Sequence, residues 1–136
     1  MKPNELMIGD WVYNTHNRKP EQVCEVRERM VMLAYNDLYD YDEIEPIPLT
    51  AALLERNGFK KFGFHDIVGQ HQWSWWIDTL TSISLWCREL NDDPKEGWMV
   101  RIESPLVSCC HKVEYVHELQ QTLRTCKIEK EIKLED

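Results

Sequence analysis

One histidine, two glutamines and one arginine lie at helical spacing near the C-terminal end of the sequence. His117, Gln121 and Arg124 are separated by four and three residues, and Gln120 lies on the same arc. Amide and guanidinium groups on one helix face can bind a carboxylate, a phosphate or a peptide backbone. A solvated face, or an interface with the N-terminal section, is the more common use of such an arc. We take these four residues as a candidate binding surface and keep that structural alternative open.

The pair His117-Glu118 begins a pattern in which zinc proteases place a second histidine one helical turn later. That position holds Gln121, so the zinc pattern is incomplete. The five cysteines of the chain also lack the paired short spacing of a zinc site. Cys109 and Cys110 are adjacent, and neighbours on a strand point to opposite faces. We predict no metal site and no cofactor.

A catalytic cysteine and histidine pair is a second interpretation, using Cys109 or Cys110 with His65, His111 or His117. A nucleophilic thiolate needs a base within hydrogen-bond reach and a lowered pKa, and sequence neighbours on a strand seldom provide that geometry. The chain contains no Gly-rich phosphate loop, nucleophile elbow or dinucleotide fingerprint. A small Cys/His-dependent hydrolase or transferase is therefore an alternative to the leading hypothesis.

Six tryptophans are unusual in a chain of 136 residues. Alternation places Trp73 and Trp75 on one face of a strand, whereas Trp76 and Trp86 fall out of phase with their apolar neighbours. Either these two pack against the N-terminal section or they form an exposed aromatic patch that marks a binding surface. We favour packing because aromatic side chains dominate small cores, and we keep Trp76 and Trp86 in the candidate surface.

The charge of the chain is −8, from 16 Lys and Arg against 24 Asp and Glu. Residues 30–55 contain six acidic residues and no Lys or Arg, so this stretch would repel a phosphate backbone. A nucleic-acid-binding accessory protein is therefore an unlikely alternative. The sequence has no apolar run of about 20 residues and no signal-peptide core at its start, so we expect a cytoplasmic protein without a membrane span.

The first section of the chain reads as a small β unit. Four short runs are compatible with strands, and turn-forming residues separate the first two. These runs cover residues 8–13, 22–26, 30–34 and 39–44. Four short strands within residues 1–46 predict a small, strongly bent sheet in the manner of an SH3-like barrel.

A short helix is predicted after the connector Pro46-Ile47-Pro48. Thr50 is a plausible N-cap for residues 51–57, and Leu49 and Leu54 are spaced as a hydrophobic staple. Gly58 can take the left-handed position that ends the helix in a Schellman motif.

Residues 59–111 predict an antiparallel sheet of three to four strands. Its segments are residues 73–77, 82–87, 98–103 and 106–110, and a turn at 91–97 joins the middle two as a hairpin. An apolar stripe predicts a final helix over 113–126 that covers this sheet. The tail from residue 127 alternates well enough for an edge strand, with a frayed end as the other interpretation. We therefore predict an α+β protein of two tightly packed parts, residues 1–46 and 47–136.

Three motifs in order resemble those of a family of small uncharacterised proteins that is common in gut bacterial genomes and their phage-like elements. They are Gly9-Asp10-Trp11-Val12, the run from Ile44 to Thr50, and Tyr115-Val116-His117-Glu118-Leu119-Gln120. The resemblance covers nearly the whole chain. It implies one small protein and no activity, cofactor or catalytic residue.

The leading functional hypothesis is a non-catalytic module, of phage or mobile-element origin, that binds a protein partner or forms a homo-oligomer. The candidate surfaces for this role are the out-of-phase tryptophans and the polar helix arc.

Overall fold

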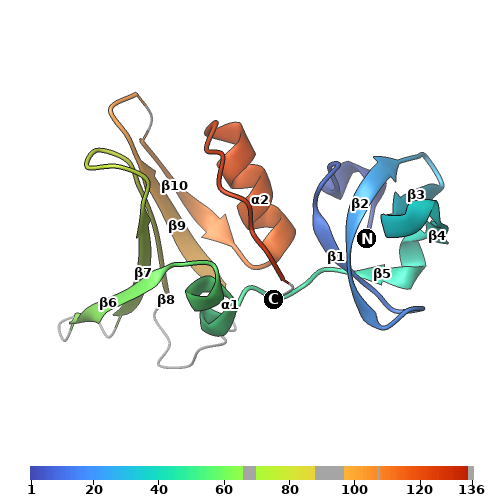
Figure 1. Ribbon diagram of the computed structural model, residues 1–136, viewed down its shortest axis with the longest axis horizontal. Helices are drawn as coiled ribbons and strands as arrows, with labels where there is room; N and C mark the ends of the chain where they lie inside the picture. The colour runs from blue at the N-terminus through green and yellow to red at the C-terminus, as the bar shows by residue number, and fades with distance from the viewer. Residues whose placement is uncertain (66–69, 88–96, 107, 135–136) are drawn as a thin grey trace. The chain divides into compact units, whose positions relative to one another are not determined.

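The computed structural model describes residues 1–65, 70–87, 97–106 and 108–134 (Figure 1). The protein is α+β, with two antiparallel sheets and two helices among these residues. The chain divides into two compact units, each with its own sheet. Unit 1 comprises Met1–Pro48 and Tyr115–Asp136, and unit 2 comprises Leu49–Glu114.

The first sheet, in unit 1, has the strand order β4-β3-β2-β1-β5. Its strands are β1 (Trp11–Asn14), β2 (Lys19–Val26), β3 (Met30–Leu33), β4 (Leu38–Asp40) and β5 (Ile44–Glu45). Short 3₁₀ turns lie at η1 (Pro3–Glu5), η2 (Ala34–Asn36) and η3 (Tyr41–Glu43).

The long strand β2 bends this sheet. Its first half pairs with β1 and its second half with β3, and the register shifts between Val23 and Glu25. Such irregularities increase local twist, so the inner faces of the two halves enclose one core. One cluster of buried residues in this core comprises Leu6, Val12, Val23, Val31, Leu33, Tyr39, Tyr41 and Ile44.

The predicted SH3-like barrel is not confirmed. Within the described residues no pairing joins β4 to β5, so the sheet does not close. The predicted strand over 39–44 is two short strands separated by η3. The carboxylate of Glu43 accepts a hydrogen bond from the backbone N–H of Asp40 at 3.3 Å, and this local bond stabilises the turn at the expense of strand pairing.

The helix α1 (Ala51–Arg56) has the two ends predicted from the sequence. Thr50 Oγ1 accepts a hydrogen bond from the N–H of Leu53 at 3.3 Å. At the other end, Phe59 N–H donates to the Leu54 carbonyl, and Gly58, with φ of 88°, donates to Glu55. These two bonds are those of a Schellman motif.

The second sheet, in unit 2, has five strands in the order β10-β9-β8-β7-β6, one more than the upper number predicted. They are β6 (Lys60–His65), β7 (Gln70–Trp76), β8 (Ser82–Cys87), β9 (Trp98–Glu103) and β10 (Ser108–Val113). The predicted antiparallel pairing of 82–87 with 98–103 is confirmed. Most of the predicted turn at 91–97 lies outside the described residues.

Two tryptophans anchor the core of unit 2. The rings of Trp73 and Trp98 meet edge to face, with centroids 5.2 Å apart. Trp98 Nε1 donates to the Leu49 carbonyl at 2.8 Å, and Trp73 Nε1 donates to the Glu55 carboxylate of α1 at 3.1 Å. Both indole N–H groups are therefore satisfied in a buried setting, which allows these large side chains to fill the core.

The helix α2 (Val116–Thr125) belongs to unit 1, whereas the sequence analysis placed residues 113–126 in the second part of the chain. Hydrogen bonds from the polar face of α2 to residues near the N-terminus hold the helix in unit 1. In the tail beyond α2, residues 128–134 form no edge strand. Ile132 is buried, and its carbonyl accepts a hydrogen bond from Trp11 Nε1 at 2.8 Å. No helix in the described part of the chain is long and apolar enough to span a membrane.

Candidate binding surface

The polar arc of α2 is used within unit 1. The side-chain amide of Gln120 makes two hydrogen bonds to the start of β1. Its Oε1 accepts from the N–H of Trp11 at 2.8 Å, and its Nε2 donates to the Gly9 carbonyl at 3.0 Å. One glutamine thus satisfies a backbone donor and a backbone acceptor more than 100 residues away in the sequence.

The buried carboxylate of Asp10 holds the rest of the arc. It accepts hydrogen bonds from the N–H of Met7 at 2.9 Å and from Gln121 Nε2 at 2.7 Å, and it forms an ion pair with Arg124. Asp10 is fully buried, whereas the Arg124 side chain is 32% exposed. Burying a carboxylate costs free energy unless its oxygens accept hydrogen bonds, so these three donors are what allows Asp10 to be buried.

His117 is the one member of the arc that keeps an unsatisfied atom. Its ring is buried and stacks on Tyr115, with centroids 5.9 Å apart and planes inclined by 12°. Nδ1 has no hydrogen-bond partner among the residues that the structure describes. Burial lowers the pKa of His117 below 6.5, and the nearby carboxylates of Asp10, Glu118 and Glu5 partly oppose this shift.

Acidification is expected to destabilise unit 1 through His117. In the folded state the ring resists protonation, whereas in the unfolded chain it takes up a proton as the pH falls through 6.5. The unfolded state then binds more protons, so this contribution lowers the free energy of unfolding below that pH and adds nothing above it. Urea unfolding at pH 5, 6, 7 and 8 measures the effect.

The variant His117→Gln is the control for this dependence, because glutamine does not titrate. Its stability should vary less between pH 7 and pH 5 than that of the wild type. A wild-type protein that gains stability relative to the variant as the pH falls would contradict the assignment.

The other two predicted site residues share one face of the second sheet. Gln72 pairs with Trp86 and Trp76 pairs with Ser82, and residues paired across antiparallel strands point to the same side. Trp76 and Gln72 are an even number of positions apart on β7, so both tryptophans lie on this outer face. The structure therefore brings Trp76 and Trp86 onto one surface, about 13 Å apart along the strand direction.

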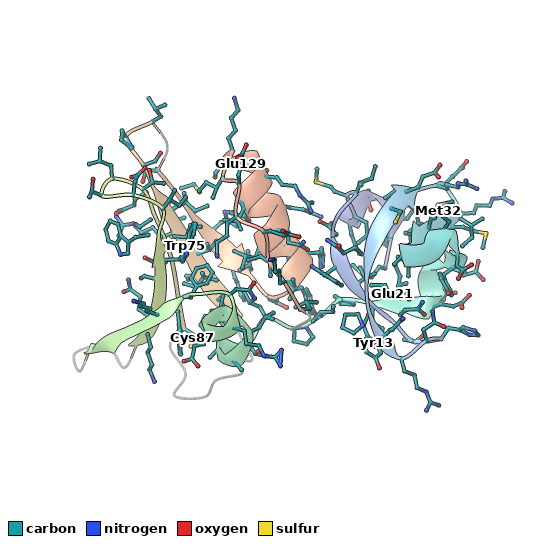
Figure 2. All side chains as sticks on the ribbon, viewed as in Figure 1. Tyr13, Glu21, Met32, Trp75, Cys87 and Glu129 are labelled. Atoms are coloured by element: carbon teal, nitrogen blue, oxygen red, sulfur yellow. The ribbon has the colours of Figure 1, made fainter. Side chains whose placement is uncertain are left out.

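Most of the other described residues named on the outer face are polar, although Met99 pairs with Trp86 and shares this face. Ser74 and Ser84 are paired across β7 and β8, and their hydroxyl oxygens lie 3.0 Å apart. On β9, Arg101 and Glu103 form an ion pair at 2.6 Å, with both side chains about half exposed. Figure 2 shows side chains standing out from this sheet, with Trp75 and Cys87 marking β7 and β8. Trp86 is half-buried among these residues, whereas Trp76 is 56% exposed.

Trp76 is exposed on the sheet of unit 2, and its packing against the N-terminal section, the interpretation favoured from the sequence, stays a prediction. Three further apolar side chains are exposed at the same end of the sheet, in the β7–β8 and β9–β10 turns. They are Ile77 at 42%, Leu80 at 67% and Leu106 at 94%. We call Trp76, Ile77, Leu80 and Leu106 the hairpin-tip patch. The sequence analysis missed the last three, because a lone leucine in a turn carries no signal of its own.

The cysteines of β10 have the alternation expected from the sequence. Cys109 pairs with Ile102 and Cys110 with Arg101, so the two thiols point to opposite faces. Cys109 is half-buried and Cys110 is exposed. In the described ranges no group of three or more His, Cys, Asp and Glu side chains is placed to hold a metal ion. A Cys/His catalytic pair stays a prediction, and the side chain of His65 lies outside the described part.

No family model, curated protein or solved structure matches the chain. The resemblance drawn from the three motifs therefore stays a prediction, and the geometry of the two units carries the functional argument.

Proposed function

We propose that the protein is a non-catalytic module that binds a protein partner through the hairpin-tip patch of unit 2. The observation that carries this proposal is the gathering of four large, exposed apolar side chains on neighbouring turns of one sheet end. Contiguous apolar surface of this kind on a soluble protein usually marks an interaction site. The aromatic ring of Trp76 is of the type that supplies most binding energy in protein interfaces.

The polar arc of α2 is less suited to be the primary binding surface. Its side chains already form hydrogen bonds and an ion pair with residues 9–11 of the same unit; they are those of Gln120, Gln121 and Arg124. A ligand would have to replace these contacts, and each lost bond to a buried group costs about 1–3 kcal/mol. The hairpin-tip patch has no such intramolecular competition to overcome at its exposed side chains.

We further propose that unit 1 is an SH3-like module serving as the scaffold of a cytoplasmic protein encoded by a mobile element. The strongly bent β2, shared by two three-stranded halves, and the 3₁₀ turn ahead of β5 support the SH3-like part. The three sequence motifs support the mobile-element origin.

A photo-crosslinking amino acid placed at single positions in the full chain tests the binding role. At Leu106 it should capture a partner protein in the cell that makes this protein. Leu38 is the matched control, because it is an exposed leucine on a strand of unit 1. Equal capture at the two positions, or capture at Leu38 alone, would remove the proposal.

A further inference from the structure

We propose that a second copy of this chain is an occupant of the hairpin-tip patch, so that two copies associate tip to tip. This inference rests on the proposed function and names one partner for the same surface. It starts from strand register. Trp76 pairs with Ser82, Ser82 with Glu103, and Glu103 with Ser108, so one row of residues crosses four strands just below both turns.

The row brings the two turns together. Neighbouring strands are about 4.8 Å apart, so the β7–β8 turn and the β9–β10 turn lie roughly 10 Å from each other. Figure 1 shows both turns extending from the same end of the second sheet. Leu80 and Leu106 are exposed in these turns, at the end of the sheet where Trp76 lies, so we treat these side chains as one apolar patch.

The β7–β8 turn holds its shape without a partner. Ile77 N–H donates to the Thr81 carbonyl at 3.0 Å, and Asp78 Oδ1 accepts from the N–H groups of Leu80 and Thr81, each at 2.8 Å. In the other turn, Pro105 restricts the backbone just before Leu106. Because the β7–β8 turn is already held by these hydrogen bonds, a partner loses little conformational entropy when it binds there.

The size of the patch fits a weak dimer. Its four side chains expose about 500 Å² of apolar surface per copy, near the upper limit of what a monomer leaves uncovered. Standard interfaces bury about 800 Å² per partner, and weak ones less. The neighbouring exposed residue Ser108 extends the contact toward that range, whereas Ser82 is buried. We therefore expect a dimer with a Kd of about 10–100 µM.

Charge favours a second copy at this place over an anionic lipid surface. Copies of a chain with a charge of −8 repel each other, so they associate best where the surface is neutral. Arg101 is neutralised by Glu103, and Asp78, whose Oδ1 accepts two hydrogen bonds within its own turn, adds one carboxylate beside the patch. An apolar tip that enters an anionic membrane normally has unpaired basic residues beside it. A self-complementary patch also suits the two-fold contact of a dimer.

Sedimentation velocity of the full chain from about 5 to 500 µM tests this inference. The wild type should pass from monomer to dimer, and the double variant Trp76→Ser, Leu106→Ser should weaken the association at least tenfold. The matched control is Ile8→Ser, Leu38→Ser, which removes two exposed apolar side chains of unit 1 and should leave the dimer unchanged. Circular dichroism establishes that all three proteins are folded.

A wild type that is monomeric throughout, or a dimer that the tip variant forms equally well, would overturn the inference. So would a monomer that co-sediments with phosphatidylcholine vesicles and loses that binding in the tip variant, because the occupant is then a lipid surface. The proposed function fails separately. If the patch mediates a dimer but crosslinking at Leu106 captures no other protein, only the proposal of a different partner fails. If the protein is strictly monomeric but that crosslinking captures another protein, only the proposal of a second copy fails.

Discussion

Replacing Asp10 with alanine should lower the free energy of unfolding of unit 1 by about 3 kcal/mol. The substitution leaves the Met7 N–H without its acceptor and removes the ion-pair partner of Arg124. It also removes one of the two acceptors of the Gln121 amide, which still donates to the Glu5 carbonyl at 2.9 Å. Arg124 can turn toward water because a third of its side chain is exposed, so the loss falls mainly on the two other donors. Amide hydrogen exchange, read separately for β1 and α2, measures the change in each element.

Glu103→Ala is the control for this substitution. Glu103 also forms an ion pair with an arginine, but both partners are about half exposed, and such pairs contribute about 0–1 kcal/mol. In a double-mutant cycle, Asp10→Ala and Arg124→Ala should be strongly non-additive. Additive effects, or equal losses for Asp10→Ala and Glu103→Ala, would show that Asp10 does not hold α2 in place.

Replacing Trp98 with alanine should lower the free energy of unfolding of unit 2 by about 4 kcal/mol. The change removes a fully buried side chain, its ring contact with Trp73 and the hydrogen bond to the Leu49 carbonyl. The cavity adds to the lost transfer free energy because neighbouring residues relax only in part. Denaturant unfolding followed by circular dichroism measures the loss.

Trp76→Ala provides a matched comparison, since it removes the same side chain from another strand of the same sheet. Trp76 is more than half exposed, so its loss should change stability by about 0.5 kcal/mol or less. Similar losses for the two variants would mean that Trp76 is part of the core and that the hairpin-tip patch is not a free surface.

Local signals in the sequence were sufficient to predict α1. An N-cap acts within three residues and a Schellman motif within five, so Thr50 and Gly58 determine the two ends whatever surrounds them. Alternation likewise predicted which strands of the second sheet form a hairpin. These features depend on interactions between residues that are close together in the sequence.

The position of α2 could not be predicted in the same way. Its polar arc was recognised, but whether the arc faces solvent depends on Asp10, which lies 111 residues from Gln121 in the sequence. Interfaces with the N-terminal section were one of the alternatives considered, and the hydrogen bonds of Gln120 and Gln121 have that form. The aspartate between Gly9 and the apolar run from Trp11 was the sequence feature that could have indicated such an anchor.

The hairpin-tip patch was beyond sequence reasoning for a different reason. Trp76 was selected because it is out of phase, but Leu80 and Leu106 are single apolar residues in turns, which are common on protein surfaces. Only the register of four strands shows that these turns are neighbours. The site thus depends on which strands pair, and the periodicity within each strand does not reveal that.

The central claim is that binding resides in the hairpin tips and that the α2 arc serves stability. Crosslinking from Leu106 in Trp76→Ser and in Gln121→Ala, each with its free energy of unfolding, tests this claim most directly. We predict that Trp76→Ser keeps its stability and loses most of the crosslinked product, whereas Gln121→Ala loses about 1–2 kcal/mol and keeps the product at a temperature where it is folded. Full crosslinking in Trp76→Ser together with its loss in folded Gln121→Ala would contradict the account.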